Sequence, residues 1–139
     1  MRPSLLYRIS AVLLVLFGAA HTLGFRQADP TWGVDPVIGF MHSRHFDVQG
    51  FSRSYWDLFL AVGFSVGVFY FFAAALAWQL GGLPPGALAS MRGAAWAFAL
   101  CFVALTVVSS LYLFSLPIAF SGVIAVCLTA AAYLGRREA

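Results

Sequence analysis

Charged side chains divide the sequence into long apolar stretches. Seventeen uncharged residues lie between Arg8 and Arg26, and Leu58–Leu80 forms a second stretch of 23. A membrane hydrocarbon core about 30 Å thick needs about 20 apolar residues in helical form. The pattern therefore predicts two membrane-spanning helices, at about residues 5–25 and 55–80, with the Arg8 side chain reaching out to the interface.

The longest apolar stretch, Gly93–Gly135, has 43 residues without a charge. One helix of that length would extend roughly 64 Å, about twice the core thickness, so the chain must fold back. Ser115 and Pro117 provide the best turn, because serine caps a helix and proline suits its first turn. We therefore expect two further spans, at about residues 87–114 and 116–134.

Composition agrees with a membrane protein. Only thirteen of the 139 residues are charged, none of them is lysine, and the mean hydropathy is +0.89. Soluble domains carry roughly 25% charged residues, so a soluble enzyme, a disordered chain and a nucleic-acid-binding protein are excluded. The expected fold is all-α: a polytopic bundle of four transmembrane helices, forming one domain in the lipid bilayer.

The distribution of arginines predicts an orientation. Four spans place both ends of the chain on one side, together with Arg2, Arg8, Arg92, Arg136 and Arg137. The other side carries three arginines, so cytoplasmic termini in a bacterial inner membrane are favoured. Gly18-Ala19-Ala20 also resembles a signal-peptide cleavage site, but the apolar run continues to Phe25, which favours an uncleaved first helix.

A long first extramembrane loop, residues 26–53, holds much of the polar chemistry. Asp35 and Pro36 resemble a helix start, and the apolar positions that follow recur at helical spacing. This pattern predicts a short helix at about residues 36–45, which would lie on the bundle or in the membrane interface.

The same loop contains a weak metal-binding pattern. His42, His45 and Asp47 form H-x-x-H-x-D, and imidazole and carboxylate groups are usual ligands of zinc and iron. A fourth ligand at a recognisable spacing is missing. We therefore assign no metal firmly and expect no cofactor.

Two of the ionisable residues within the predicted spans, His21 and Asp57, are candidates for a role in function. His21 lies about one helical turn inside the first span, where it indicates either a functional group or a hydrogen bond to a loop or water. Ser54-x-x-Asp57 precedes an apolar run and resembles a capping box, so Asp57 is expected at the start of the second span. Arg53 lies four residues before Asp57 and could pair with it.

Polar residues concentrate in the outer half of the predicted bundle. His21 and Asp57 share that half with hydroxyl groups of the third and fourth spans: Thr106, Ser109, Ser110, Ser115 and Ser121. The asymmetry predicts a polar pocket that opens outward and binds a small or lipid-like ligand. The candidate pocket residues are His21, His45, Asp47, Gln49, Arg53, Tyr55 and Asp57.

Two other functions stay open. One is a membrane-embedded enzyme or metal-dependent oxidoreductase that uses His42, His45 and Asp47, although the common hydrolase, zincin and phosphate-loop motifs are missing. The other is a structural subunit of a membrane complex or a homo-oligomer. Gly63-x-x-x-Gly67 is a helix-packing pattern that serves contacts within a chain or between chains, and we favour contacts within this chain.

Two segments support a family resemblance. The stretch His45–Asp57, which reads HFDVQGFSRSYWD, and the stretch His21–Phe25, which reads HTLGF, resemble an uncharacterised family of small bacterial four-helix integral membrane proteins. The resemblance implies a four-span bundle with cytoplasmic termini and supplies no catalytic residue. In architecture alone, the layout also resembles the DoxX-like proteins.

Overall fold

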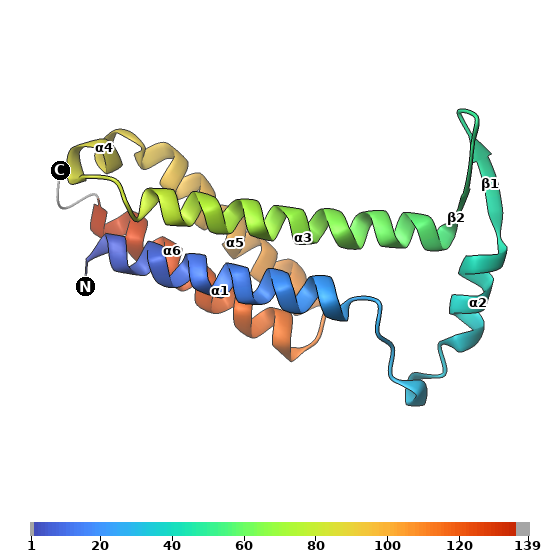
Figure 1. Ribbon diagram of the computed structural model, residues 1–139. Helices are drawn as coiled ribbons and strands as arrows, with labels where there is room; N and C mark the ends of the chain where they lie inside the picture. The colour runs from blue at the N-terminus through green and yellow to red at the C-terminus, as the bar shows by residue number, and fades with distance from the viewer. Residues whose placement is uncertain (1, 136–139) are drawn as a thin grey trace. The chain divides into compact units, whose positions relative to one another are not determined.

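The computed structural model describes residues 2–135 and is mainly helical (Figure 1). Arg136 and Arg137, which contribute to the orientation prediction, lie outside the described residues. In chain order the elements are α1 (Pro3–Gly24), the 3-10 helix η1 (Pro30–Trp32), α2 (Asp35–Ser43), β1 (His45–Val48), β2 (Phe51–Ser54), α3 (Tyr55–Leu80), α4 (Pro85–Ser90), α5 (Arg92–Tyr112) and α6 (Ser115–Gly135).

Four helices are long and apolar enough to cross a membrane. These are α1, α3, α5 and α6, with 22, 26, 21 and 21 residues. Each has the length of roughly 20 residues that a hydrocarbon core requires. The predicted all-α architecture with four apolar helices is confirmed, and it fits a multi-pass membrane protein.

The third of the predicted helices, at 87–114, is divided in the structure. A turn at Met91 separates α4 from α5. The hydroxyl of Ser90 donates to the carbonyl of Ala87 over 2.8 Å, and the amide of Met91 uses the same carbonyl. Such a side-chain bond competes with the helical ladder and favours a bend. The other three helices begin and end within two residues of the predicted 5–25, 55–80 and 116–134.

The chain groups into two compact units. Unit 1 comprises the described residues up to Phe17 and from Tyr70 onward, and unit 2 comprises Gly18–Phe69. The helices α1 and α3 contribute to both. Each unit has its own packing and is described separately below.

Unit 1 is a helical bundle with an apolar core. Its fully buried side chains include Leu14 of α1, Leu80 of α3, and Ile124 and Leu128 of α6. Buried alanines on α3, α5 and α6 allow close approach of the helix backbones, which is how helices associate where lipid supplies no hydrophobic driving force. In Figure 1, α5 and α6 run side by side and are joined by a short turn.

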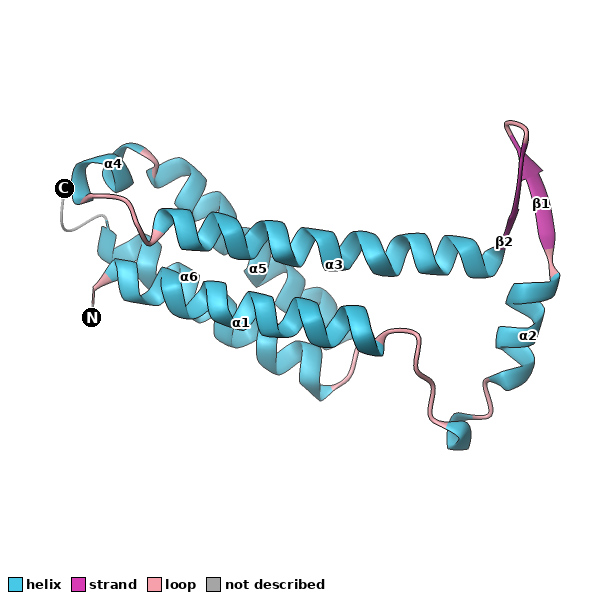
Figure 2. Cartoon of the chain, viewed as in Figure 1, coloured by secondary structure: helices cyan, strands magenta, loops and turns pink. Residues whose placement is uncertain are grey.

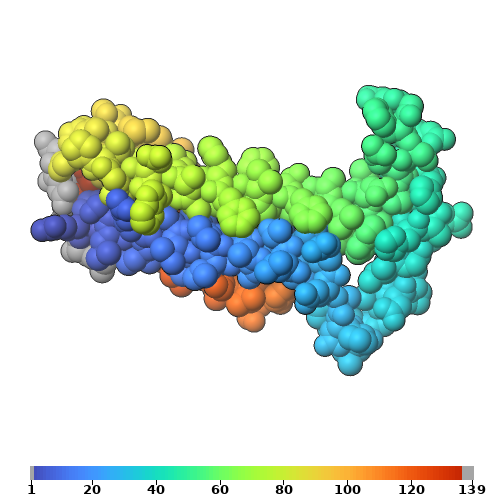
Figure 3. Space-filling model, in the orientation of Figure 1, coloured from blue at the N-terminus to red at the C-terminus, as the bar shows by residue number. Residues whose placement is uncertain are grey.

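The outward-facing surface of the long helices is apolar as well. Half or more of Val68, Phe69, Leu100, Leu111 and Val126 is exposed. Along α3, which is green in Figure 3, side chains stand at the surface facing the viewer. A surface of this composition fits a lipid environment, because a water-soluble protein rarely exposes so large an apolar area.

Unit 2 contains more structure than the long loop that the sequence predicts. The segment between α1 and α3 holds η1, α2 and a two-stranded hairpin, the strands drawn in magenta in Figure 2. The helix α2 begins at Asp35, as the Asp-Pro pair predicts, but it ends at Ser43 rather than at 45. It ends there because Arg44 is extended and His45 begins β1.

The hairpin is antiparallel and closed by a two-residue turn. His45 pairs with Ser54, and the register continues to Val48 and Phe51. The turn residues Gln49 and Gly50 have φ angles of 51° and 82°. Positive φ at both central positions is the type I′ turn, whose twist matches that of the two strands.

Candidate functional site

His21 donates a hydrogen bond between two helices of unit 2. Its Nε2 lies 2.9 Å from the carbonyl oxygen of Gly63 on α3. A carbonyl oxygen only accepts, so Nε2 carries the hydrogen and donates it. The imidazole also stacks against the ring of Phe25, with 5.4 Å between the ring centroids. His21 therefore joins the end of α1 to α3, which is a structural task.

Gly63 and Gly67 provide the surface on which this end of α1 rests. A Cβ atom on Gly63 would collide with the ring of Phe25, and one on Gly67 would collide with the hydroxyl of Thr22. Both glycines are buried. The small-residue pattern thus serves packing within the chain, as favoured from the sequence. This face is occupied and is not open to a partner helix, so the structural-subunit hypothesis loses its motivating feature.

Asp57 forms the capping box that the sequence predicts. One carboxylate oxygen, Oδ2, accepts from the amide of Ser54 over 2.8 Å and from its hydroxyl over 2.9 Å. In return, the hydroxyl oxygen of Ser54 accepts from the amide of Asp57 over 3.1 Å. These bonds satisfy two backbone donors at the start of α3.

Loss of this cap has a measurable consequence. Ser54 is buried, and we expect Ser54→Ala to lower the free energy of unfolding by about 1 kcal/mol. The substitution removes the hydroxyl that accepts from the amide of Asp57, so this backbone donor at the start of α3 is left without a partner. Thermal or denaturant unfolding in detergent measures the change. Ser52→Ala, an exposed serine on the same strand, is the matched control and should leave stability nearly unchanged. Equal effects of the two substitutions would contradict the capping role.

The two faces of the hairpin differ in polarity. His45, Asp47, Ser52 and Ser54 share one face through the register of β1 and β2. The other face carries Phe46, Val48, Phe51 and Arg53. More than half of the Val48 and Phe51 side chains is exposed. The hairpin is therefore an amphipathic ribbon whose apolar side is largely uncovered.

His42, His45 and Asp47 do not assemble a metal centre. Among residues 2–135, no three His, Cys, Asp or Glu side chains are placed to hold a metal ion. The pattern assumes one continuous helical turn, but His42 lies on α2 and the other two lie on β1. The ring of His42 stacks on Trp56 at 4.5 Å, while Nδ1 of His45 lies 3.3 Å from the carbonyl oxygen of Ser43.

Three arginines of unit 2 lie over aromatic rings. The guanidinium of Arg26 is 5.4 Å from the ring centre of Phe64, that of Arg44 is 5.4 Å from Phe40, and that of Arg53 is 5.1 Å from Phe51. These distances are typical of cation–π attraction. Each arginine also presents a planar set of donors suited to phosphate or carboxylate groups.

Aromatic rings connect the elements of unit 2. Trp56 lies between His42 and Phe59, and Phe59 contacts Phe25 at 5.5 Å. Tyr55 contacts Phe40 of α2 at 6.5 Å and Phe46 of β1 at 5.3 Å. The sequence analysis did not predict that Arg26, Arg44 and Arg53 lie over the rings of Phe64, Phe40 and Phe51. The available signal was the recurrence of Arg next to or two residues from Phe, as in Phe25-Arg26 and Phe51-Ser52-Arg53.

A turn stabilised by Asp29 begins this segment. Its Oδ1 accepts from the amide of Thr31 over 2.8 Å and from the Thr31 hydroxyl over 2.6 Å. These bonds favour the ionised form and hold the pKa of Asp29 below its ordinary value. Gly33 ends the turn with a φ of 63°, a left-handed conformation that glycine adopts easily.

The seven candidate pocket residues have different neighbours, although His45 and Arg53 lie close enough to Asp57 to interact electrostatically with its carboxylate. His21 bonds to Gly63, and Asp57 belongs to the helix cap. His45 and Asp47 are exposed on the polar face of the hairpin, Gln49 is at its tip, and Arg53 and Tyr55 belong to the arginine–aromatic contacts. Unit 2 also offers an exposed amphipathic surface on the hairpin.

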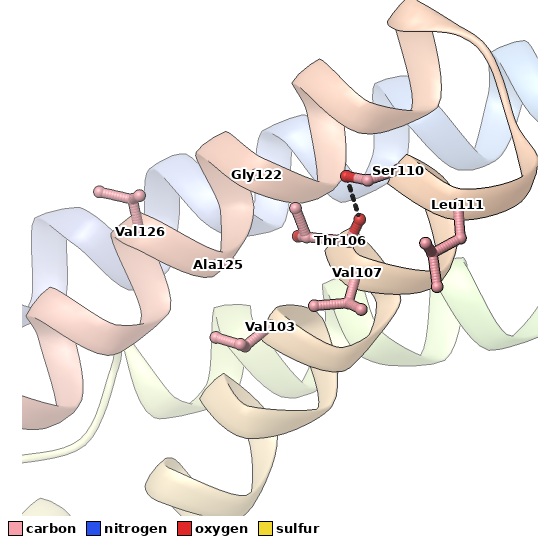
Figure 4. Close-up of a pocket in the computed structure, with 8 residues that line it drawn as sticks. All are labelled: Val103, Thr106, Val107, Ser110, Leu111, Gly122, Ala125 and Val126. Atoms are coloured by element: carbon pink, nitrogen blue, oxygen red, sulfur yellow. Dashed lines mark hydrogen bonds between the residues drawn. The ribbon is translucent and has the colours of Figure 1, made fainter.

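The hydroxyl groups of α5 and α6 do not form a polar pocket either. Thr106 donates to the carbonyl of Phe102, Ser110 to that of Thr106, and Ser121 to that of Pro117, each over 2.7–2.8 Å within its own helix. Figure 4 shows Thr106 and Ser110 in a surface groove of about 380 Å³ between α5 and α6, whose other lining residues are Val103, Val107, Leu111, Gly122, Ala125 and Val126. Thr106 and Ser110 use their only hydroxyl hydrogens within α5, and the other residues that line the groove are apolar, so the groove is mainly apolar.

Both cysteines, Cys101 of α5 and Cys127 of α6, are free thiols. Cys127 of α6 is half-buried, and Cys101 of α5 is exposed. Neither lies in a pair suited to thiol redox chemistry.

A comparison of the chain with protein-family models, with curated proteins and with solved structures finds no match.

Proposed function

We propose that this chain is a multi-pass protein of the bacterial inner membrane that binds an amphipathic, lipid-like ligand on one surface of unit 2. We name this surface the interfacial segment and define it as residues 25–57. The bacterial origin rests on the family resemblance given above. Cytoplasmic termini are part of this proposal, because five arginines of the sequence, Arg2, Arg8, Arg92, Arg136 and Arg137, belong to the side of the termini and three belong to the other side.

The observation that carries the proposal is the pairing of guanidinium groups with exposed apolar groups. Arg53 lies over Phe51 on the open apolar face of the hairpin, and Arg44 lies over Phe40 on α2. More than half of Trp32 and Phe40 is exposed in the same segment. A ligand with a hydrocarbon chain and a phosphate or carboxylate group satisfies both the rings and the arginines.

The charge balance of the interfacial segment narrows the ligand class. Three arginines there are matched by four aspartates: Asp29, Asp35, Asp47 and Asp57. A surface with this balance attracts anions weakly, so it suits a zwitterionic head group better than a strongly acidic one. The contacts within the chain do not support the two alternatives from the sequence. One is metal chemistry at His42, His45 and Asp47, and the other is partner binding at Gly63 and Gly67.

The proposal is tested by comparing the two faces of the hairpin. A lysophosphatidylcholine probe that carries a fluorescent label is titrated into the protein in nanodiscs. We expect Phe51→Ser to weaken binding about tenfold or more, because an apolar side chain of this size contributes roughly 1.5–3 kcal/mol when covered. Arg53→Gln should weaken it less, through loss of the charged contact.

The polar face supplies the matched control. His45→Asn and Asp47→Asn change exposed residues on the same hairpin and should leave the affinity within about twofold. If these two variants lose binding while Phe51→Ser retains it, the ligand uses the polar face and the proposal is wrong. Binding that no substitution on either face changes would also refute it.

A further inference from the structure

Tyr7 has a fully buried hydroxyl group without a partner. The residue lies on α1 within unit 1 and is 0% exposed. Among the residues that the structure describes, no group forms a hydrogen bond with its hydroxyl oxygen. A buried hydroxyl that is left unpaired is unfavourable, and tyrosine usually finds a partner when it is buried. The position therefore indicates a partner from outside the described chain.

Tyr7 lines a small cavity together with a charged side chain. The cavity measures about 10 Å³, and Arg92, Leu88, Ala95 and Gly135 contribute to its wall. A volume of this size holds about one oxygen atom or water molecule. A buried water needs two to four polar partners, whereas this wall consists mainly of Leu, Ala and Gly. The guanidinium of Arg92 adds a positive charge to this wall, which an oxygen of an anion neutralises and a water molecule does not.

The location of the cavity points to the membrane surface. It lies where α1 begins, where α5 begins after the Met91 turn, and where α6 ends. Antiparallel spans place these three helix ends on the same side of the membrane. The charged residues described in unit 1 are Arg2, Arg8 and Arg92, without an acidic residue among them. A basic site between transmembrane helices at this level attracts acidic head groups.

Arg8 shows that this end of the bundle already holds a cation at the interface. Its guanidinium lies 3.9 Å from the ring centre of Trp78 on α3. Arginine and tryptophan are both typical of the boundary between hydrocarbon and water. This boundary is where a phospholipid presents its phosphate, while its acyl chains remain among the exposed apolar side chains.

We propose that this cavity binds the phosphate group of an anionic phospholipid. One phosphate oxygen accepts a hydrogen bond from the hydroxyl of Tyr7, and the guanidinium of Arg92 pairs with the remaining oxygens. Free phosphate offers the same oxygens, but only a lipid also brings acyl chains that cover the apolar helices. The site lies in unit 1 and is independent of the ligand proposed for the interfacial segment.

The test compares lipids that differ in head group. Purified protein in detergent receives phosphatidylglycerol, phosphatidylcholine or inorganic phosphate, and thermal unfolding is followed for each. We expect phosphatidylglycerol to raise the melting temperature more than phosphatidylcholine does. Tyr7→Phe and Arg92→Gln should each require about tenfold more phosphatidylglycerol for half of the effect, as expected for loss of a hydrogen bond or ion pair to a charged group.

Two controls separate this role from general effects. Arg2→Gln removes an exposed charge from the same end without altering the cavity wall, and it should shift the half-effect concentration less than twofold. In lipid-free detergent, Tyr7→Phe should be at least as stable as the unmodified protein, since it removes an unpaired hydroxyl. The proposal is overturned if Tyr7→Phe responds to phosphatidylglycerol like the unmodified protein, if it is equally destabilised in every condition, or if inorganic phosphate alone produces the full shift.

Discussion

Gly63→Ala is expected to lower the free energy of unfolding by about 1–3 kcal/mol, although alanine is the smallest possible addition. The new Cβ atom would occupy the position of the Phe25 ring. That ring cannot move without cost, because it contacts His21, Phe59 and Phe64. Displacing it also disturbs the hydrogen bond from His21 to the carbonyl of Gly63. Reversible unfolding in mixed micelles measures the loss.

Two further variants identify the cause of that loss. Gly39→Ala makes the same change on α2, where a Cβ atom has nothing within 4 Å, and it should raise stability by about 0.5–1 kcal/mol through the ordinary helical preference for alanine. Phe25→Leu added to Gly63→Ala should recover part of the stability, because the shorter side chain vacates the space. A loss at Gly63 that Phe25→Leu does not relieve would show that the collision is not responsible.

The long helices could be predicted because their signal does not depend on tertiary contacts. Spacing between charges, as between Arg8 and Arg26, limits where a chain can enter and leave a membrane. The hairpin was missed because its strands have only four residues each and its turn is Gln49-Gly50 rather than Asn-Gly. The bend at Met91 has no proline or glycine at the break, so the pattern of residues conceals it.

Contacts in the candidate site could be predicted where the two partners are close in the sequence, and not where they are distant. The Ser54–Asp57 cap joins residues three positions apart and was predicted correctly. The partner of His21 lies 42 positions away and depends on the register between α1 and α3, which spacing along the chain does not specify. The predicted His–His–Asp cluster assumed that α2 continues through His45, and the chain leaves the helix before that residue.

Leu128→Ala is expected to lower the free energy of unfolding by at least about 2 kcal/mol. Leu128 of α6 is 0% exposed, and its side chain belongs to the core of unit 1. In a membrane the unfolded helix is surrounded by lipid, so transfer from water supplies little of the stability. The loss comes instead from the packing contacts of the missing atoms and from the cavity that remains, at roughly 24 cal/mol per Å³.

Leu100→Ala makes the same substitution at a similar depth and separates packing from lipid exposure. Leu100 follows the start of α5 by eight residues and Leu128 precedes the end of α6 by seven, which places both about 11–12 Å from one side of the bundle. Leu100 is 61% exposed, so lipid surrounds it before and after the change, and the loss should stay below about 0.5 kcal/mol. If Leu100→Ala costs as much as Leu128→Ala in the same bilayer, this face of α5 is covered by protein instead of lipid. A small effect at Leu128 would mean that the core of unit 1 does not pack as described.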